Sequence, residues 1–237
     1  MSGITTILLD AGGTLIHPDR AFILRTLGNF GITRDEAAFL IADQTAREAR
    51  SAAIRSGQII DDAGSWRLYA ARLLDVLGCT PDIAAQVSSA VGVRHIEGTL
   101  WSHVEPGTAD TLAELKDRGY TLGVVSNADG RVDQFLEHAG LRQYLDFIID
   151  SGQVGFEKPN PRIFEIALER AGAEPDEAVH VGDVYEVDVV GARAAGIEPV
   201  FLSTTGGAVP DDVTVIRSFT ELTRALDRMH SGQPHIS

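Results

Sequence analysis

Apolar and polar positions follow three successive rhythms along the chain. Residues 4–9 form a continuous run of apolar and β-branched residues, which is typical of a strand buried on both faces. From residue 19 to residue 93 the apolar positions recur with helical spacing. Breaks near residues 31–33, 56–57 and 78–81 divide this region into four expected helices.

After residue 107 strands and helices alternate. We expect helices at 108–118, 131–139, 162–171, 187–195 and 219–229, and strands at 120–126, 147–150, 178–182, 199–203 and 213–217. Strands that alternate with helices of this length predict an α/β fold with a doubly wound parallel sheet. In such sheets the binding crevice lies just beyond the carboxyl ends of the strands.

Chemically useful side chains stand at those ends. Asp10 follows the first strand, Ser126 and Asn127 end the second, and Asp183 follows the strand at 178–182. Asp188 comes five residues later, and Lys158 lies in a loop rich in proline. Carboxylates suit Mg²⁺, which uses one or two of them together with substrate phosphate. A carboxylate can also act as a nucleophile and form an aspartyl-phosphate.

Four motifs carry a specific resemblance. D-x-x-G-T-L follows the first strand and S-N the second, and G-x-x-K-P-x-P and V-G-D-x-x-x-x-D-x-x-G-A-x-x-A-G come after them in order. Together they resemble the motifs of the haloacid dehalogenase-like hydrolase superfamily, from residue 4 to about residue 203. The resemblance implies a Rossmann-like catalytic core formed by residues 1–16 and 104–237, with residues 17–103 as an inserted helical cap.

The same resemblance implies a role for each motif residue. Asp10 would be the nucleophile, and its carboxylate, the Gly12 carbonyl and Asp183 would hold Mg²⁺ as the cofactor. The transferring phosphoryl group of a small phosphorylated metabolite would be held by Thr14, Ser126 and Lys158, while Asn127 would shape the phosphate-binding loop. Asp188 would orient Lys158 or a metal-bound water.

Gly12 departs from the pattern of the phosphatases in this superfamily. They carry D-x-D, whose second aspartate protonates the leaving group, and here that position is glycine. General acid–base catalysis contributes roughly 10²–10⁴-fold, so either another group substitutes or turnover is slow. His17, near the start of the expected cap, is one candidate substitute, although a surface-loop position is the expectation for a histidine before Pro18.

Three alternatives to phosphate ester hydrolysis differ in the residues that they need. Phosphonate hydrolysis through a Schiff base needs a lysine in the cap, and residues 17–103 contain none. A 2-haloacid dehalogenase resembles the D-A-x-G-T-L sequence but needs no metal and lacks the acidic pair of Asp183 and Asp188. A non-catalytic or weakly active phosphate-binding descendant remains the main alternative.

Charge and composition restrict the partners. The 237 residues carry a formal net charge of −14, the opposite of what nucleic-acid binding requires, so no nucleic-acid partner is expected. No apolar run is long enough to cross a bilayer, which predicts no membrane partner. The lone Cys79 cannot form an internal disulfide, so a cytoplasmic location is expected. The oligomeric state is not readable from the sequence.

Two further sets of residues are assigned to packing. His180 lies within a predicted strand and is expected to be a core residue. Trp66, Tyr69 and Leu73 share one face of a predicted helix. They are expected to form the core of the cap rather than a substrate pocket.

Overall fold

The computed structural model describes residues 3–58, 61–204 and 211–231. The chain divides into two compact units. We call Met1–Ile16 with Val104–Ser237 the sheet unit, and His17–His103 the helical unit. Parts of the predicted core at residues 205–210 and 232–237 lie outside the described residues.

A parallel sheet forms the centre of the sheet unit. Its strands, in the spatial order β5-β4-β1-β6-β7-β8, are β5 (Phe147–Asp150), β4 (Thr121–Ser126), β1 (Thr6–Leu9), β6 (Ala178–Gly182), β7 (Glu198–Leu202) and β8 (Thr214–Ile216). All neighbours pair in parallel. The chain winds outward from β1 in both directions, so the strand order reverses there, and in sheets of this kind ligands bind at the carboxyl ends next to such a reversal. The predicted fold class is confirmed.

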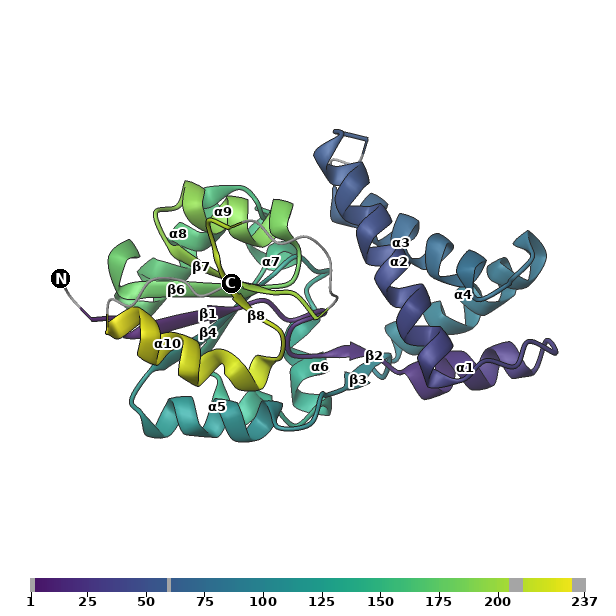
Figure 1. Ribbon diagram of the computed structural model, residues 1–237, viewed down its shortest axis with the longest axis horizontal. Coiled ribbons are helices and arrows are strands. Elements are labelled where there is room, and N and C mark those ends of the chain that lie inside the picture. The colour runs from purple at the N-terminus through teal and green to yellow at the C-terminus, as the bar shows by residue number, and fades with distance from the viewer. Residues whose placement is uncertain (1–2, 59–60, 205–210, 232–237) are drawn as a thin grey trace. The chain divides into compact units, whose positions relative to one another are not determined.

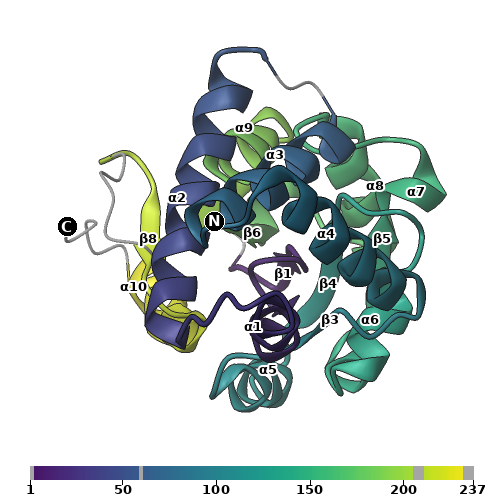
Figure 2. The same cartoon turned by 90° about the vertical axis from the view of Figure 1, so that its right-hand side faces the viewer.

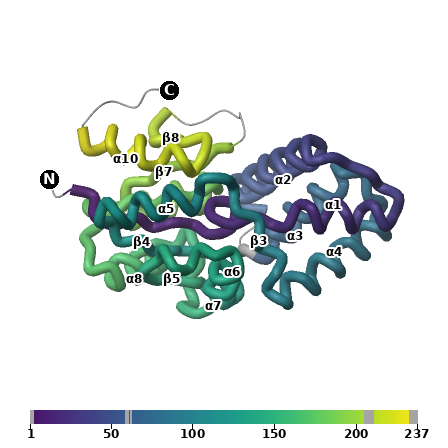
Figure 3. The backbone as a smooth tube through the Cα atoms, turned by 90° about the horizontal axis from the view of Figure 1, so that it is seen from below, coloured from purple at the N-terminus to yellow at the C-terminus, as the bar shows by residue number. Residues whose placement is uncertain are grey.

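Helices cover both faces of this sheet, as Figures 1 and 3 show. One face is covered by α5 (Thr108–Asp117) and α10 (Leu222–His230), and the other by α8 (Pro161–Ala171) and α9 (Val190–Ala194). Short helices α6 (Val132–His138) and α7 (Ser151–Val154) occupy connections next to β5. Strand β1 is buried throughout because both of its faces are covered, which explains its unbroken apolar sequence.

Four helices make up most of the helical unit (Figure 2). They are α1 (Arg20–Gly28), α2 (Glu36–Arg55), α3 (Asp62–Val76) and α4 (Pro81–Ile96), with breaks where the sequence predicts them. Asp19, Asp35, Asp61 and Thr80 each cap the amino end of one helix by accepting a backbone N–H. Each cap satisfies a donor that the first helical turn leaves open.

Three local features differ from the sequence-based expectations. β2 (His17–Pro18) pairs with β3 (Trp101–His103) in an antiparallel ribbon that periodicity does not indicate, because two- and three-residue strands carry no readable period. His17 is buried in β2 rather than lying in a surface loop. The expected helix at 187–195 is instead a π-helical turn, Tyr185–Val189, followed by α9.

Candidate functional site

A buried ion cluster lies at the carboxyl ends of β1 and β6. The Nζ atom of Lys158 donates to Oδ1 of Asp10 and to Oδ1 of Asp188, each at 2.7 Å. The Lys158 and Asp188 side chains are almost wholly buried, and that of Asp10 is 9% exposed. Residues separated by 148 and 30 positions therefore meet in one cluster.

Asp188 is held in place by three donors. Its Oδ1 accepts from Lys158 and lies 3.0 Å from Nε2 of the fully buried His180, while its Oδ2 accepts the Val184 N–H at 2.9 Å. The π-helical turn directs Asp188 back toward the end of β6. Gly182 permits this approach, since a Cβ atom there would lie 2.2 Å from Cγ of Asp188.

The backbone of Lys158 is fixed by the side chain of Asn127. The Asn127 amide donates to the Lys158 carbonyl at 2.9 Å, and its oxygen accepts the Lys158 N–H at 2.7 Å. Asn127 directly follows β4, so these two bonds attach the lysine loop to the sheet. The Asn127 side chain thus supports the loop that carries Lys158.

The turn after β1 is closed by its own backbone. Leu15 and Ile16 donate to the Ala11 carbonyl, and Gly13 donates to the Ile16 carbonyl. Among the backbone bonds of the described residues, none uses the Gly12 carbonyl. Gly13 has φ 96°, whereas Gly12 is not among the described glycines with positive φ. Only Gly13 therefore needs to be glycine for conformational reasons.

Two hydroxyl groups lie at the same end of the sheet. Thr14 is 2% exposed, and its Oγ1 atom has no hydrogen-bond partner among the described residues. Ser126 is 4% exposed and is the last residue of β4, the direct neighbour of β1. A buried hydroxyl without a partner costs free energy, which a bound ligand can recover.

The cluster contains more negative than positive charge. Burial, together with the Asp188 and Asp183 carboxylates, raises the pKa of Asp10 to about 7 against the lowering effect of Lys158. Burial alone would raise the pKa of Asp188 as well, but Lys158 and His180 hold it well below its usual value. The pKa of Lys158 is raised by both carboxylates in spite of burial. Lys158 and Asp188 therefore stay charged and balance each other. The unbalanced negative charge of the cluster falls on Asp10.

The structure brings together most of the residues singled out from sequence. Asp10, Lys158 and Asp188 are in contact, and Asp183 is near enough to shift the pKa of Asp10. His180 was expected to be only a core residue. It is buried, but it also contacts Asp188, and burial lowers its pKa, which favours the neutral ring. Strand periodicity reveals burial and not a contact eight residues away, so nothing in the sequence indicated this role.

No described helix is both long enough and apolar enough to cross a membrane.

Residues 4–196 match the family of haloacid dehalogenase-like hydrolases.

Two curated relatives show the extent of the sequence similarity. Haloacid dehalogenase-like hydrolase domain-containing protein 3 of Mus musculus is 39% identical over 140 residues, which is 56% of this chain and 55% of that protein. The glyceraldehyde 3-phosphate phosphatase of Methanothermobacter thermautotrophicus is 40% identical over 131 residues, which is 51% of this chain and 58% of the phosphatase. The matches thus span little more than half the length of these relatives.

Two solved structures extend the similarity to nearly the whole chain. The haloacid dehalogenase-type phosphatase of Thermococcus onnurineus is 26% identical with a TM-score of 0.60, covering 98% of this chain and 100% of that one. The 2-haloacid dehalogenase of Pseudomonas syringae pv. Tomato DC3000 is also 26% identical, with a TM-score of 0.57 and coverage of 95% and 99%. Overall similarity therefore does not separate phosphatase from dehalogenase chemistry.

Proposed function

We propose that this chain, which belongs to the haloacid dehalogenase-like hydrolases, hydrolyses phosphate monoesters of small metabolites with Mg²⁺. Asp10 is the nucleophile in this proposal, and an aspartyl-phosphate is the intermediate. Similarity to the archaeal glyceraldehyde 3-phosphate phosphatase supports this choice of substrate class. The helical unit would act as the cap.

One observation carries the proposal: a buried lysine bonded to two buried carboxylates at the switch point of the sheet. A buried ion pair costs desolvation free energy and rarely stabilises a fold better than apolar residues of similar size would. Such a cluster is therefore more typical of a reaction site than of a structural core. The unpartnered Thr14 hydroxyl and the neighbouring Ser126 supply donors suited to phosphoryl oxygens.

The residues present fit a magnesium ion. Among the described residues no group of three or more histidine, cysteine, aspartate or glutamate side chains forms a complete metal site. Mg²⁺ does not require one, because it commonly binds one or two carboxylates together with water and substrate phosphate. Asp10 and Asp183 would supply the carboxylates, and Gly12 a carbonyl that the turn leaves unused. Besides burial, the Asp188 and Asp183 carboxylates raise the pKa of Asp10, and a cation would offset their negative charge.

In the first chemical step an Asp10 carboxylate oxygen attacks phosphorus, and the bond from phosphorus to the leaving alcohol oxygen breaks. Bound Mg²⁺ supplies charge neutralisation for the phosphoryl oxygens. Lys158, Thr14 and Ser126 hold those oxygens, and Asp188 and Asn127 keep Lys158 in place from its two ends. Water then hydrolyses the aspartyl-phosphate, which releases inorganic phosphate and restores the Asp10 carboxylate.

The leaving alcohol needs a proton that Gly12 cannot give. This observation favours the second candidate function, a phosphate-binding protein that turns over slowly. Activated aryl phosphates do not need the proton, so the chain should hydrolyse p-nitrophenyl phosphate better than sugar phosphates. Dehalogenation is the third candidate, and the acidic pair of Asp183 and Asp188 argues against it.

The deciding experiment is a panel of small phosphorylated metabolites assayed with and without Mg²⁺, with halide release from 2-chloropropionate measured in parallel. Rapid acid quenching should trap labelled phosphate on Asp10. Trapping with turnover supports the enzyme, and binding of phosphate without trapping supports the binding protein. Halide release without metal would support the dehalogenase.

A further inference from the structure

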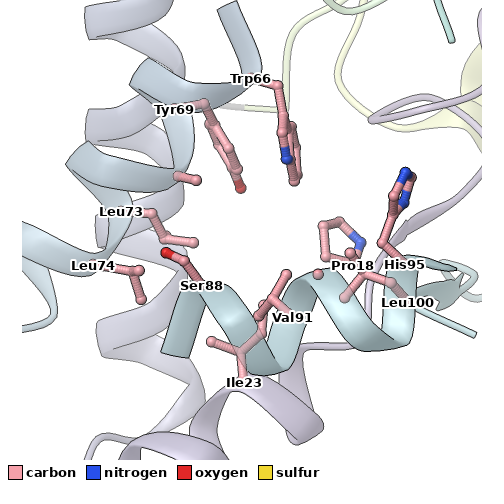
Figure 4. Close-up of a pocket in the computed structure, with 12 residues that line it drawn as sticks. Pro18, Ile23, Trp66, Tyr69, Leu73, Leu74, Ser88, Val91, His95 and Leu100 are labelled. Carbon is pink, nitrogen blue, oxygen red and sulfur yellow. The ribbon is translucent and has the colours of Figure 1, made fainter. Parts of the chain in front are cut away.

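The helical unit contains an apolar pocket between α1, α3 and α4, of about 140 Å³ (Figure 4). We propose that this pocket is a binding site for a small uncharged molecule that carries a single six-membered aromatic ring. All the lining residues belong to the helical unit. The inference therefore does not depend on the phosphatase proposal.

The shape and the walls of the pocket suit a flat ring. Trp66 and Tyr69 extend side by side from α3, and Ile23 and Val91 lie on the opposite wall of the pocket (Figure 4). The Trp66 and Tyr69 rings are stacked with centroids 5.1 Å apart, and Trp101 continues the row at 5.1 Å from Trp66. An enclosed apolar cavity of about 150 Å³ has room for a benzene ring. The volume here is nearly the same.

The lining also fixes the charge of the occupant. The hydroxyl of Tyr69 donates to the Asp43 carboxylate. Tyr69 therefore presents mainly its ring to the pocket. His95 and Tyr69 are the only titratable acids or bases among the described lining residues. A charged guest would therefore lose its hydration without gaining a partner. Exposed Ser88 can instead receive one neutral polar group of the guest.

Gly92 marks a point on the pocket wall where added side-chain atoms would meet open space. It lies within α4 and lines the pocket, and a Cβ atom added there would meet nothing within 4 Å. Its φ is not positive, so neither the backbone nor a close neighbour requires glycine. Glycine in a helix interior is about 1 kcal/mol less favourable than alanine. Gly182 and Gly191, in contrast, face atoms closer than 3.0 Å. A larger side chain at Gly92 would therefore extend into space that no neighbouring atom occupies.

Benzyl alcohol is the probe, and tryptophan fluorescence of the full chain is the readout. The chain has two tryptophans, and both stand in the aromatic row beside the pocket. We expect a saturable fluorescence change with benzyl alcohol. Benzoate and benzylamine, which have the same ring and opposite charges, should bind at least tenfold more weakly. Equal binding of all three would overturn the proposal, as would the lack of any saturable change.

Gly92→Leu fills the pocket and should weaken benzyl alcohol binding at least tenfold. It also replaces a helix-interior glycine by a good helix former, so folding should be retained and can be checked by circular dichroism. Gly28→Leu is the matched control, because Gly28 also has open space around its Cβ position but lies outside the pocket. Ala70→Leu is a second filling variant. Unchanged binding in folded Gly92→Leu and Ala70→Leu would place the ring elsewhere and overturn the proposal.

Discussion

Replacing Gly12 by aspartate tests the step of the proposed reaction that Gly12 cannot perform, which is protonation of the leaving alcohol. The change puts a carboxyl group where phosphatases of the superfamily carry their general acid. General acid–base catalysis contributes roughly 10²–10⁴-fold, which corresponds to about 3–5 kcal/mol of barrier at 1.36 kcal/mol per tenfold. The gain in turnover should approach this range for alkyl phosphates and should be small for p-nitrophenyl phosphate, whose leaving group needs no proton.

The backbone permits this substitution at Gly12 and not at its neighbour. Gly12 is absent from the described glycines with positive φ, so its backbone conformation does not require glycine. Gly13, with φ 96°, lies where a side chain costs about 1 kcal/mol or more. Gly13→Asp is thus a matched control that adds the same charge to the same turn, and it should lose stability without gaining turnover.

The added charge has one predictable side effect. A fourth carboxylate beside Asp183 and Asp188 should raise the pKa of Asp10 further above its present value of about 7. The assay therefore needs saturating Mg²⁺, with turnover measured on glycerol 3-phosphate and p-nitrophenyl phosphate. A folded, Mg²⁺-binding Gly12→Asp protein with no gain on the alkyl substrate would refute the reasoning. His17→Ala would then test whether His17 already provides the proton.

Three further predictions concern the metal, the nucleophile and the fold. EDTA should abolish phosphatase activity and Mg²⁺ should restore it, whereas full activity in EDTA would remove the metal assignment. Asp10→Asn should reduce turnover to background with its thermal unfolding transition retained; measurable turnover would mean that water attacks phosphorus directly. Tyr69→Phe removes a buried donor to Asp43, whose pKa is lowered although burial opposes this. The free energy of unfolding, measured with urea at neutral pH, should fall by about 1–3 kcal/mol. Because an Asp43 with a lowered pKa stabilises the fold only while ionised, the loss should shrink as pH falls below about 4, and a pH-independent loss would contradict this account.

The sequence alone determined the order of elements and the residue types at the strand ends. Strands 147–150 and 178–182 have the predicted bounds, because a run buried on both faces and ended by a polar residue leaves little freedom in register. Parallel strands place their carboxyl ends on one edge of the sheet. The sequence alone therefore predicts that Asp10, Ser126 and Asp183 lie at one edge of the sheet.

Tertiary structure decided which of these groups touch and which spaces stay empty. The bonds from Lys158 to Asp10 and Asp188, and from Asn127 to Lys158, join residues 30 or more positions apart, and no local periodicity encodes such contacts. The contact of His180 with Asp188 depends on the π-helical turn that carries Asp188. Likewise Trp66, Tyr69 and Leu73 could be predicted to share a helix face. Whether that face closes on a neighbour or borders a pocket depends on how α3 and α4 pack, which is a property of the assembled helices and not of any one of them.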